Sequence, residues 1–353
     1  MKSNFALILL SFFVASEVLA NNFFIPNYYR NRRTPNNFSA IGWSDRHEAS
    51  VEMKNDSSKE KEAGFTNRET DTKEMNGKVF HKLDSKLTLE AFFRQIDEEE
   101  ENFVFVDEDK TKTHLLSLGV GYELPTAPIA LGVGIRNVKS QNEDQGTGLK
   151  SNSESKLLAL GAGYRLDNNI FLGLGYYNIH IDFSNFGGST SHIYSFGGGK
   201  VYGDLKKPDA AVETIFLWSN ENRRTSINII AQGLVNLDSM QVYGAVSSGA
   251  TKERDSSQDD STSGMLMAGL DYQFGNFYIG PQANYDVTEN EGSTSADETD
   301  LLLSLEGGFR TEQLEIFARL GKTSNKEKNP PSISPDDVKL EGTDYALGAT
   351  YFF

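Results

Sequence analysis

The sequence predicts an all-β protein, a transmembrane antiparallel up-and-down β-barrel. Three observations predict this fold. A glycine-x-x-aromatic unit recurs along the chain, apolar and polar residues alternate within each unit, and short turns at one end of the units contrast with long acidic loops at the other. Alternation with a period of two indicates strands, because successive side chains of a strand point to opposite faces.

The N-terminus carries a targeting signal. Lys2 is followed by the apolar stretch FALILLSFFVA and then by Val18-Leu19-Ala20, as in a secretory signal peptide with a small residue at its cleavage site. We therefore expect residues 1–20 to be a signal peptide. A membrane anchor is the alternative, but the 11 apolar residues are fewer than the roughly 20 that a spanning helix needs.

The composition excludes several classes of function. The 353 residues contain no cysteine, which excludes disulfides, thiolate catalysis and cysteine-based metal sites. The formal net charge of −16 argues against nucleic acid as a partner, because phosphate binding needs a basic face. The acids are clustered: residues 97–109 carry eight acids and no base, and residues 286–300 carry six acids and no base. No pattern indicates a cofactor or a metal site.

The repeat sets the expected number of strands. Six units end on an aromatic, and two degenerate units, at Asn236 and Phe309, fill the gaps, so that successive units are 34 to 42 residues apart. Eight units imply eight strands and eight antiparallel partners, giving 16 strands. The first pair, residues 41–56 and 69–83, alternates poorly, so 14 strands plus an N-terminal segment is the alternative. We expect the barrel to occupy residues 41–353 and residues 21–40 to form a periplasmic or lumenal segment.

The stretch GMLMAGLDYQFGNFYIGPQANYDV shows how one unit is built. Leu266, Leu270 and Phe274 share one face with other apolar residues, whereas Asp271 and Gln273 share the opposite face with small or polar ones. A tight turn at residues 275–276 separates two alternating runs, which predicts a β-hairpin.

A consistently apolar face favours a membrane protein. In hydrocarbon every backbone N–H and C=O must be paired, so a sheet survives there only if it closes and has no edges. Apolar side chains then face lipid and polar ones face the lumen, with aromatic rings at the lipid–water boundary. The aromatics expected in this girdle are Phe80, Tyr122, Tyr164, Tyr202, Tyr272 and Phe309.

The C-terminal residues GATYFF resemble the end of bacterial outer-membrane β-barrels, whose last strand carries a glycine-x-x-aromatic-x-aromatic signal read by the barrel-assembly machinery. Gly348, Tyr351 and Phe353 match this signal, whereas Ala346 stands where a polar residue is usual. With the signal peptide and strand number, the chain resembles the general porin type. The resemblance implies location in the outer membrane as a multi-pass barrel, passive diffusion of small hydrophilic solutes, lipid and lipopolysaccharide as surroundings, and a homo-oligomer as an open alternative.

Charged residues on the inward face are the candidates for selectivity. The alternative reading is that they are merely solvated or paired wall residues, since the interior of a water-filled barrel is polar by necessity. With acidic stretches at the mouth, they predict a weak preference for cations. The candidates are Glu123, Arg136, Arg165, Asp271, Asp286, Glu306, Arg310, Glu315 and Arg319.

Inward glycines form a second pattern on four consecutive strands. Glycine in a strand marks curvature or the close approach of other backbone. One hypothesis is that the segment NNFFIPNYYRNRRTPNNF folds into the lumen against these glycines, with its arginines opposite acidic walls. The glycines are Gly119, Gly121, Gly132, Gly134, Gly161, Gly163, Gly173 and Gly175.

Other functions remain as alternatives. A non-conducting or plugged barrel would serve envelope structure, adhesion or partner binding, and a plugged 14-strand barrel would suit uptake of hydrophobic molecules. The acidic stretches could bridge divalent cations to lipopolysaccharide phosphates. The sequence shows no nucleophile elbow and no HExxH spacing, so we expect no enzymatic activity.

Overall fold

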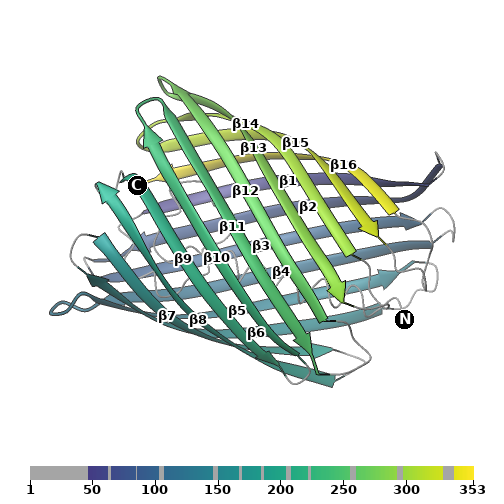
Figure 1. Cartoon of the computed structure of the whole chain (residues 1–353), viewed down its shortest axis with the longest axis horizontal. Helices are drawn as coiled ribbons and strands as arrows, with labels where there is room; N and C mark the ends of the chain where they lie inside the picture. The colour runs from purple at the N-terminus through teal and green to yellow at the C-terminus, as the bar shows by residue number, and fades with distance from the viewer. Residues whose placement is uncertain are drawn as a thin grey trace.

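The protein folds into one closed barrel of 16 antiparallel strands, in which neighbours in sequence are neighbours in the sheet (Figure 1). The prediction of 16 strands is confirmed, and the alternative of 14 is wrong. The computed structural model describes residues 47–353 apart from 63–64, 85, 103–106, 146–149, 167–168, 184–186, 204–207, 222–223, 255–259, 292–296 and 329–337. The expected signal peptide and the segment 21–40 lie outside the described residues.

The strands are 14 to 18 residues long. In chain order they are β1 (Glu48–Glu62), β2 (Phe65–Lys82), β3 (Leu87–Asn102), β4 (Asp107–Glu123), β5 (Ile129–Asp144), β6 (Lys150–Leu166), β7 (Ile170–Phe183), β8 (Gly187–Gly203), β9 (Pro208–Glu221), β10 (Arg224–Leu237), β11 (Met240–Glu253), β12 (Asp260–Phe274), β13 (Phe277–Glu291), β14 (Asp297–Arg310), β15 (Leu314–Lys328) and β16 (Val338–Phe352).

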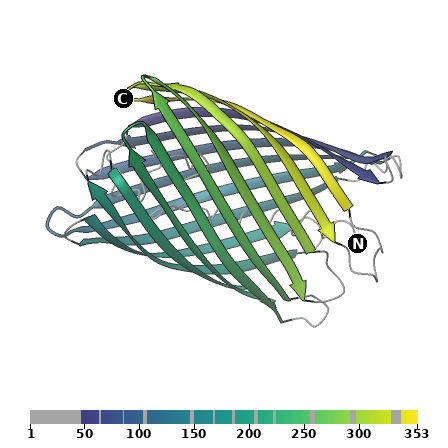
Figure 2. The same cartoon turned by 45° about the horizontal axis from the view of Figure 1, so that its top comes forward.

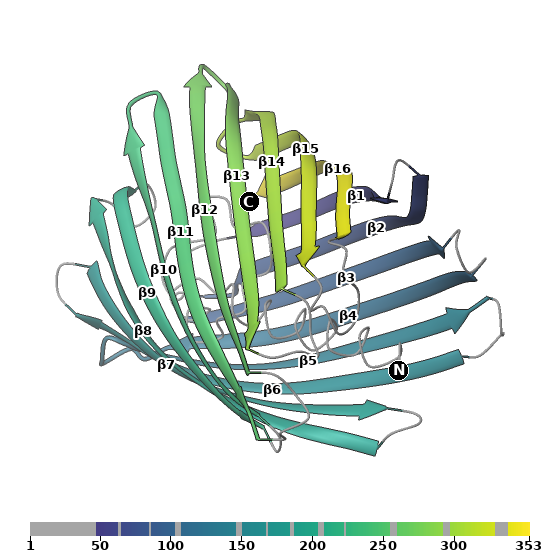
Figure 3. The ribbon, with the colours of Figure 1, turned by 45° about the vertical axis from the view of Figure 1, so that its right-hand side comes forward.

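The first and last strands close the barrel. β1 and β16 pair from Glu48 with Phe352 to Glu60 with Leu340, in continuous antiparallel register. Figure 3 shows the yellow β16 lying between β15 and the dark β1, and Figure 2 shows the strands running obliquely around the barrel. Because every strand has two neighbours, the sheet has no open edge, which satisfies the condition for burial in hydrocarbon.

Alternation fixes which side chains face out. On β4, Leu116, Leu118 and Tyr122 are exposed, whereas Leu115 and Ser117, which alternate with the two leucines, are buried. The same alternation brings large apolar side chains to the exterior of every strand, as the sequence predicts. An exterior covered with exposed leucines, valines and aromatics suits a lipid surrounding rather than water.

The acidic stretches between hairpins are strand rather than loop. The sequence predicts long loops there, but β3 continues to Asn102 and β5 to Asp144, so most of these acids extend the strands themselves. A membrane-spanning strand needs about 9–11 residues. The surplus projects from the apolar zone at one end of the barrel, the extended end. The opposite end, where β2, β4 and the other even-numbered strands up to β14 finish, is here termed the short-turn end.

The turns at the short-turn end are tight and locally encoded. Gly275 adopts a φ of 64° between β12 and β13, a conformation that glycine reaches without steric cost. Asp84 accepts hydrogen bonds from the backbone N–H groups of Lys86 and Leu87, both at 2.7 Å, and these bonds lower the pKa of its carboxyl group. Among the described residues, no α-helix combines the length and hydropathy required to cross a bilayer.

Aromatic residues stand at two levels of the exterior. Near the short-turn end, Tyr122, Tyr164, Tyr202 and Tyr272 are 38–48% exposed, and Phe309 packs edge-on against Phe277 with ring centroids 5.2 Å apart. A second set, nearer the extended end, consists of Tyr176, Tyr194, Trp218, Tyr285 and Tyr345 on the same outward face.

Phe80 does not belong to the exterior girdle. It is 6% exposed and shares the inward face of β2 with Asn76 and Lys78, whose ammonium lies 5.3 Å from its ring centroid. The prediction of an outward position for this residue is wrong. The remaining five predicted aromatics do face outward, and their role at a membrane boundary stays a prediction.

Candidate functional site

The inner wall of the barrel divides into two halves of different chemistry. From β12 through β16 and β1 to β3, ion pairs and hydrogen bonds connect inward side chains. The wall from β4 to β11 carries few charges, and a packed cluster of apolar side chains lies there among buried serines and glycines. A solute inside the barrel would therefore have a charged wall on one side and a sparsely charged wall with an apolar cluster on the other.

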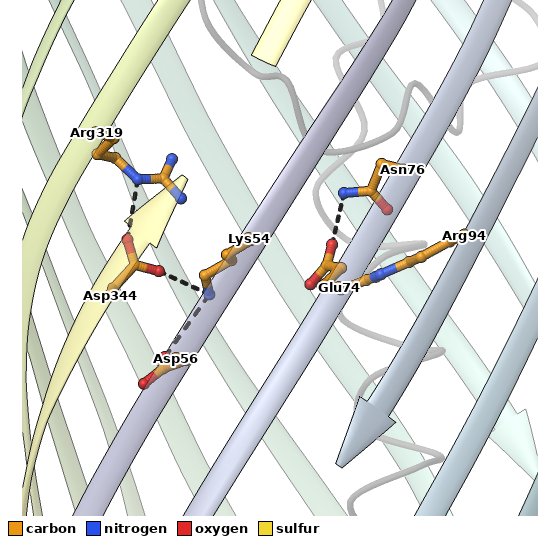
Figure 4. Close-up of polar contacts among 7 residues, drawn as sticks. All are labelled: Lys54, Asp56, Glu74, Asn76, Arg94, Arg319 and Asp344. Carbon is orange, nitrogen blue, oxygen red and sulfur yellow. Dashed lines mark hydrogen bonds and ion pairs between the residues drawn. The ribbon is translucent and has the colours of Figure 1, made fainter. Parts of the chain in front are cut away.

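The first charged cluster spans the closure of the barrel. Asp344 of β16 is fully buried, and its carboxylate lies 3.0 Å from Lys54 Nζ and 3.1 Å from Arg319 Nε. Figure 4 shows Lys54 placed between Asp344 and Asp56, which is 3.8 Å away. Two cations on one buried carboxylate tie β15, β16 and β1 together. Arg319 was predicted from the sequence, whereas Lys54 and Asp344 were not.

The second charged cluster lies on β1, β2 and β3. Glu74 accepts hydrogen bonds from Arg94 at 3.0 Å and from Asn76 at 2.6 Å (Figure 4). On the same wall, Lys78 forms an ion pair of 2.8 Å with the buried Glu48. Glu48, Glu74 and Lys78 lie on the pair of strands that alternates poorly in sequence, which is why sequence reasoning missed them. Arg94 lies on β3 and was also missed.

A third cluster on β13, β14 and β15 brings three predicted residues together. The hydroxyl of Tyr278 donates to Glu315 at 2.8 Å and lies 3.1 Å from Glu306, while Arg310 donates to Glu315 at 2.7 Å. The Arg310 guanidinium also lies 4.9 Å from the Tyr278 ring centroid. Tyr278 organises this cluster, and alternation from the outward Phe277 and Ile279 identifies it as inward.

The other predicted charges are dispersed. Glu123 and Arg165 pair at 3.6 Å near the short-turn end. Arg136 is buried within the apolar half of the wall, and Asp271 is fully buried on β12. Asp286 accepts a hydrogen bond from Asn284 at 2.6 Å. The candidates thus face inward as predicted but form no single constriction ring, and their role in selectivity stays a prediction.

The apolar half of the wall departs from the expectation of a polar lumen. On four of its strands, Leu157, Tyr177, Ile193 and Ile215 are only 1–4% exposed and belong to one packed cluster. Few charges interrupt it. One of them, Glu213, is 1% exposed and accepts a hydrogen bond from Gln232 at 3.1 Å. The expectation of a polar interior is therefore wrong at this cluster, although Ser117, Ser155 and Ser195 on β4, β6 and β8 are inward and polar as expected.

The predicted glycines line this apolar half near the short-turn end. Gly121 pairs with Gly132, Gly132 with Gly161, and Gly161 with Gly175 across four successive strands. The track continues on β8, because Gly173 pairs with Gly197. A Cβ atom on Gly197 would approach the carbonyl oxygen of Thr214 to 2.8 Å, so close strand packing accounts for glycine there. The segment proposed to lie against this track is outside the described residues.

Other site chemistry is sparse in the described part of the chain. No group of three histidine, aspartate or glutamate side chains is arranged there to hold a metal ion. The sequence prediction of no enzymatic activity remains a prediction.

Comparison with known proteins rests on structure alone. No protein-family model and no curated protein matches the chain. A Pseudomonas aeruginosa FadL homologue is 13% identical, with 90% of this chain and 92% of that chain covered and a TM-score of 0.52. The CymD monoaromatic hydrocarbon channel is 10% identical (90% and 91% covered, TM-score 0.48), and a bacterial polysaccharide outer membrane secretin is 9% identical (88% and 100%, TM-score 0.49). The chain is thus a closed 16-strand barrel of the bacterial outer-membrane type.

Proposed function

We propose that the protein is an outer-membrane channel for small solutes that carry both polar and apolar surface. The two-sided inner wall supports this proposal most directly. A general porin for hydrophilic solutes needs a polar wall throughout, whereas here Leu157, Ile193 and Ile215 belong to an apolar side. The sequence led to the expectation of a porin for small hydrophilic solutes, and this proposal changes the expected class of solute. The apolar part of such a solute would contact one side of the lumen and its polar part the other side.

The physical reason is the balance between entry and exit. An apolar wall gains about 25 cal/mol for each Å² of apolar solute surface removed from water. Facing charged clusters keep the polar part of the solute hydrated or paired. Conduction requires binding that is favourable enough for entry and weak enough for release. A wall that is apolar on one side only meets both conditions for a solute such as an aromatic cation.

Uptake into proteoliposomes tests this function. We expect the wild-type protein to pass the aromatic cation benzyltrimethylammonium faster than a sugar of similar mass. Substituting Leu157→Asn and Ile193→Asn should slow benzyltrimethylammonium and leave the sugar unchanged, while Ser117→Asn, also inward, serves as the matched control. Equal benzyltrimethylammonium uptake by the double variant and the wild type would exclude a role for the apolar wall.

A filled barrel is the second candidate function. The observation that favours it is the burial of the inner wall, because side chains such as Ile215 and Tyr177 are 1% and 2% exposed. A barrel of 16 strands with a water-filled lumen would leave its wall wet. Such a protein would serve envelope structure, adhesion or partner binding, and purified protein would then show no conductance in a planar bilayer.

Cation preference is the finer part of the channel proposal. It is supported by the charge of −16 and by the acids that extend β3 and β13 beyond the apolar zone. Such a field concentrates cations at low salt and weakens as salt rises. The reversal potential in a salt gradient should therefore have the sign of a cation-selective pore, and an anion-selective sign would refute this part.

The C-terminal residues are proposed as the signal for the barrel-assembly machinery. Tyr351 and Phe353 are 49% and 52% exposed, and their rings stack with centroids 6.0 Å apart. Both rings are therefore accessible on the exterior at the short-turn end. Removing Phe353 should slow insertion by the purified machinery without weakening the assembled barrel.

A further inference from the structure

Two histidines face each other at the short-turn end of the barrel, beside the line of closure. Glu48 pairs with Phe80 at the end of the β1–β2 register, so the next residues in the same antiparallel alignment, His47 and His81, lie opposite each other. Val79, two residues before His81, is 45% exposed, so alternation places both imidazoles on the outer face. These two residues are termed the histidine pair.

The two imidazoles are in contact through one nitrogen of each ring. Nδ1 of His47 lies 3.1 Å from Nδ1 of His81, and the ring centroids are 5.0 Å apart with the planes inclined at 64°. A hydrogen bond between two neutral rings accounts for this distance, with one Nδ1–H donating to the other Nδ1. If the donor ring takes the other neutral tautomer, with its proton on Nε2, both Nδ1 atoms present a lone pair at the same place.

The separation of the two nitrogens also fits two ligands of one metal ion. Bonds of about 2.0–2.1 Å from a metal to imidazole nitrogen, at angles between about 90° and 109°, place the two nitrogens about 2.8–3.4 Å apart. The 3.1 Å between His47 Nδ1 and His81 Nδ1 lies within this range. Turning either ring about its Cβ–Cγ bond, a broad torsion in histidine, directs both lone pairs at a common point without moving the backbone.

The chain end packs against the histidine pair and orients it. The ring of Phe353 stacks on His81 with centroids 5.6 Å apart and planes inclined at 28°, and it lies 5.9 Å from the His47 ring. The backbone N–H of Phe353 donates to the carbonyl oxygen of His47 at 2.9 Å. Because the two imidazoles are already held together on paired strands, binding an ion costs little further side-chain entropy.

We propose that the histidine pair binds one divalent transition-metal ion through Nδ1 of both residues. Imidazole nitrogen suits copper, nickel and zinc, and Cu²⁺ binds most tightly of these to a given set of nitrogen ligands. In the described part of the chain no group of three histidine, aspartate or glutamate side chains is arranged around a metal ion, so water fills the remaining positions and the ion exchanges with its surroundings.

The bound ion clamps the start of β1 to the end of β2, next to the last strand. With the C-terminal strand end on the periplasmic side, as the sequence predicts, the ion comes from the periplasm. The site lies on the exterior, so it does not depend on what the lumen conducts.

Copper titration of the full-length protein in detergent, purified without a polyhistidine tag, tests the proposal. Electron paramagnetic resonance should show one Cu²⁺ per chain with splitting from two imidazole nitrogens. His47→Asn places an amide near the position of Nδ1, which keeps a hydrogen bond to His81 but removes a ligand. We expect this variant to bind Cu²⁺ at least about tenfold more weakly, since loss of even a supporting residue costs a metal site roughly that much.

The matched controls remove other histidines from the exterior. His114→Asn and the double variant H180N/H192N leave the histidine pair intact and should each change the Cu²⁺ affinity less than about twofold. Heat-modified gel migration verifies that each variant is folded. Equal affinity in His47→Asn and wild type, an equal loss in either control, or a spectrum with only one imidazole nitrogen in the wild type would overturn the proposal.

Stability gives an independent readout. An ion that binds only the folded protein, at a concentration about 100-fold above its Kd, raises the ratio of folded to unfolded protein about 100-fold. Cu²⁺ should therefore move the urea midpoint of the wild type and of His114→Asn to higher urea and leave that of His47→Asn in place. A midpoint of the wild type that does not move at saturating Cu²⁺ would show that the histidine pair forms a hydrogen bond only.

Discussion

The carboxylate of Asp344 on the last strand lies 3.0 Å from the ammonium of Lys54 on the first strand, with the aspartate side chain fully buried. The pair crosses the line where the barrel closes, and Arg319 approaches the same carboxylate from β15 at 3.1 Å. The backbone ladder alone would allow the two strands to slip in register. A slip of one residue would turn Asp344 toward lipid, so this cluster specifies the closing register.

Replacing Asp344 by asparagine should destabilise the barrel. The amide keeps the shape but leaves Lys54 and Arg319 without their shared anion, and breaking such a buried pair typically costs about 3–5 kcal/mol. Urea-induced unfolding in lipid vesicles measures the loss. Lys54→Met in the Asp344→Asn background should recover part of it. A midpoint for Asp344→Asn equal to that of wild type would contradict a role for this cluster in closure.

Tyr278→Phe should weaken the cluster on β13–β15. The hydroxyl contacts two carboxylates, Glu306 and Glu315, and a hydrogen bond to a charged group contributes about 1.5–3 kcal/mol. Without the hydroxyl, the carboxylates of Glu306 and Glu315 lose the donor between them and repel each other more strongly. The variant should therefore unfold at a lower urea concentration than the wild type. Tyr285→Phe is a control on the same strand because Tyr285 faces outward. An equal loss of stability in both variants would mean that the contacts of the Tyr278 hydroxyl contribute nothing beyond the loss of any tyrosine hydroxyl.

Gly348→Ala should perturb the packing of Gly348 against Phe317, and it also changes a residue of the proposed assembly signal. A Cβ atom at this position would overlap the ring of Phe317, which is 3% exposed beside it. Overpacking of this kind costs about 1–3 kcal/mol. Phe317→Leu should restore stability to the Gly348→Ala protein. If stability returns while insertion by the assembly machinery stays slow, glycine acts in recognition, and if both return, its role is spatial.

Deleting residues 21–37 should raise single-channel conductance if this segment folds into the lumen. The segment carries Arg30, Arg32 and Arg33, which would meet an acidic wall. A variant with these three arginines replaced by glutamine keeps the length and tests the charge alone. Unchanged conductance after deletion would remove the idea of a lumenal segment.

Alternation and the repeat predicted the strand number, the outward faces and the inward position of most candidate charges. They failed where the two signals disagree. Phe80 follows the glycine-x-x-aromatic repeat, yet Asn76 and Lys78 share its parity and are polar, so alternation alone places it inward. The repeat indicates only that a turn follows at a fixed distance. Whether a residue such as Phe80 faces inward or outward depends on its even or odd position along the strand.

The chemistry of the lumen was less predictable. Leu115 and Leu157 are inward, but each is followed directly by an outward leucine, and two successive leucines leave no alternation to read. The acidic stretch ending β3 looked like a loop because Glu and Asp are rare in spanning strands, although strands longer than the bilayer carry them in water. Asp344 and Lys54 are 290 positions apart in sequence, and only closure of the barrel brings them together.

Planar-bilayer recording of the purified full-length protein tests the central claim, that the closed barrel conducts through its lumen. We expect discrete conductance steps, with larger steps after deletion of residues 21–37 and a reversal potential of cation-selective sign in a salt gradient. Folded protein that inserts but produces no steps, with or without that segment, would contradict the channel and leave a filled, structural barrel.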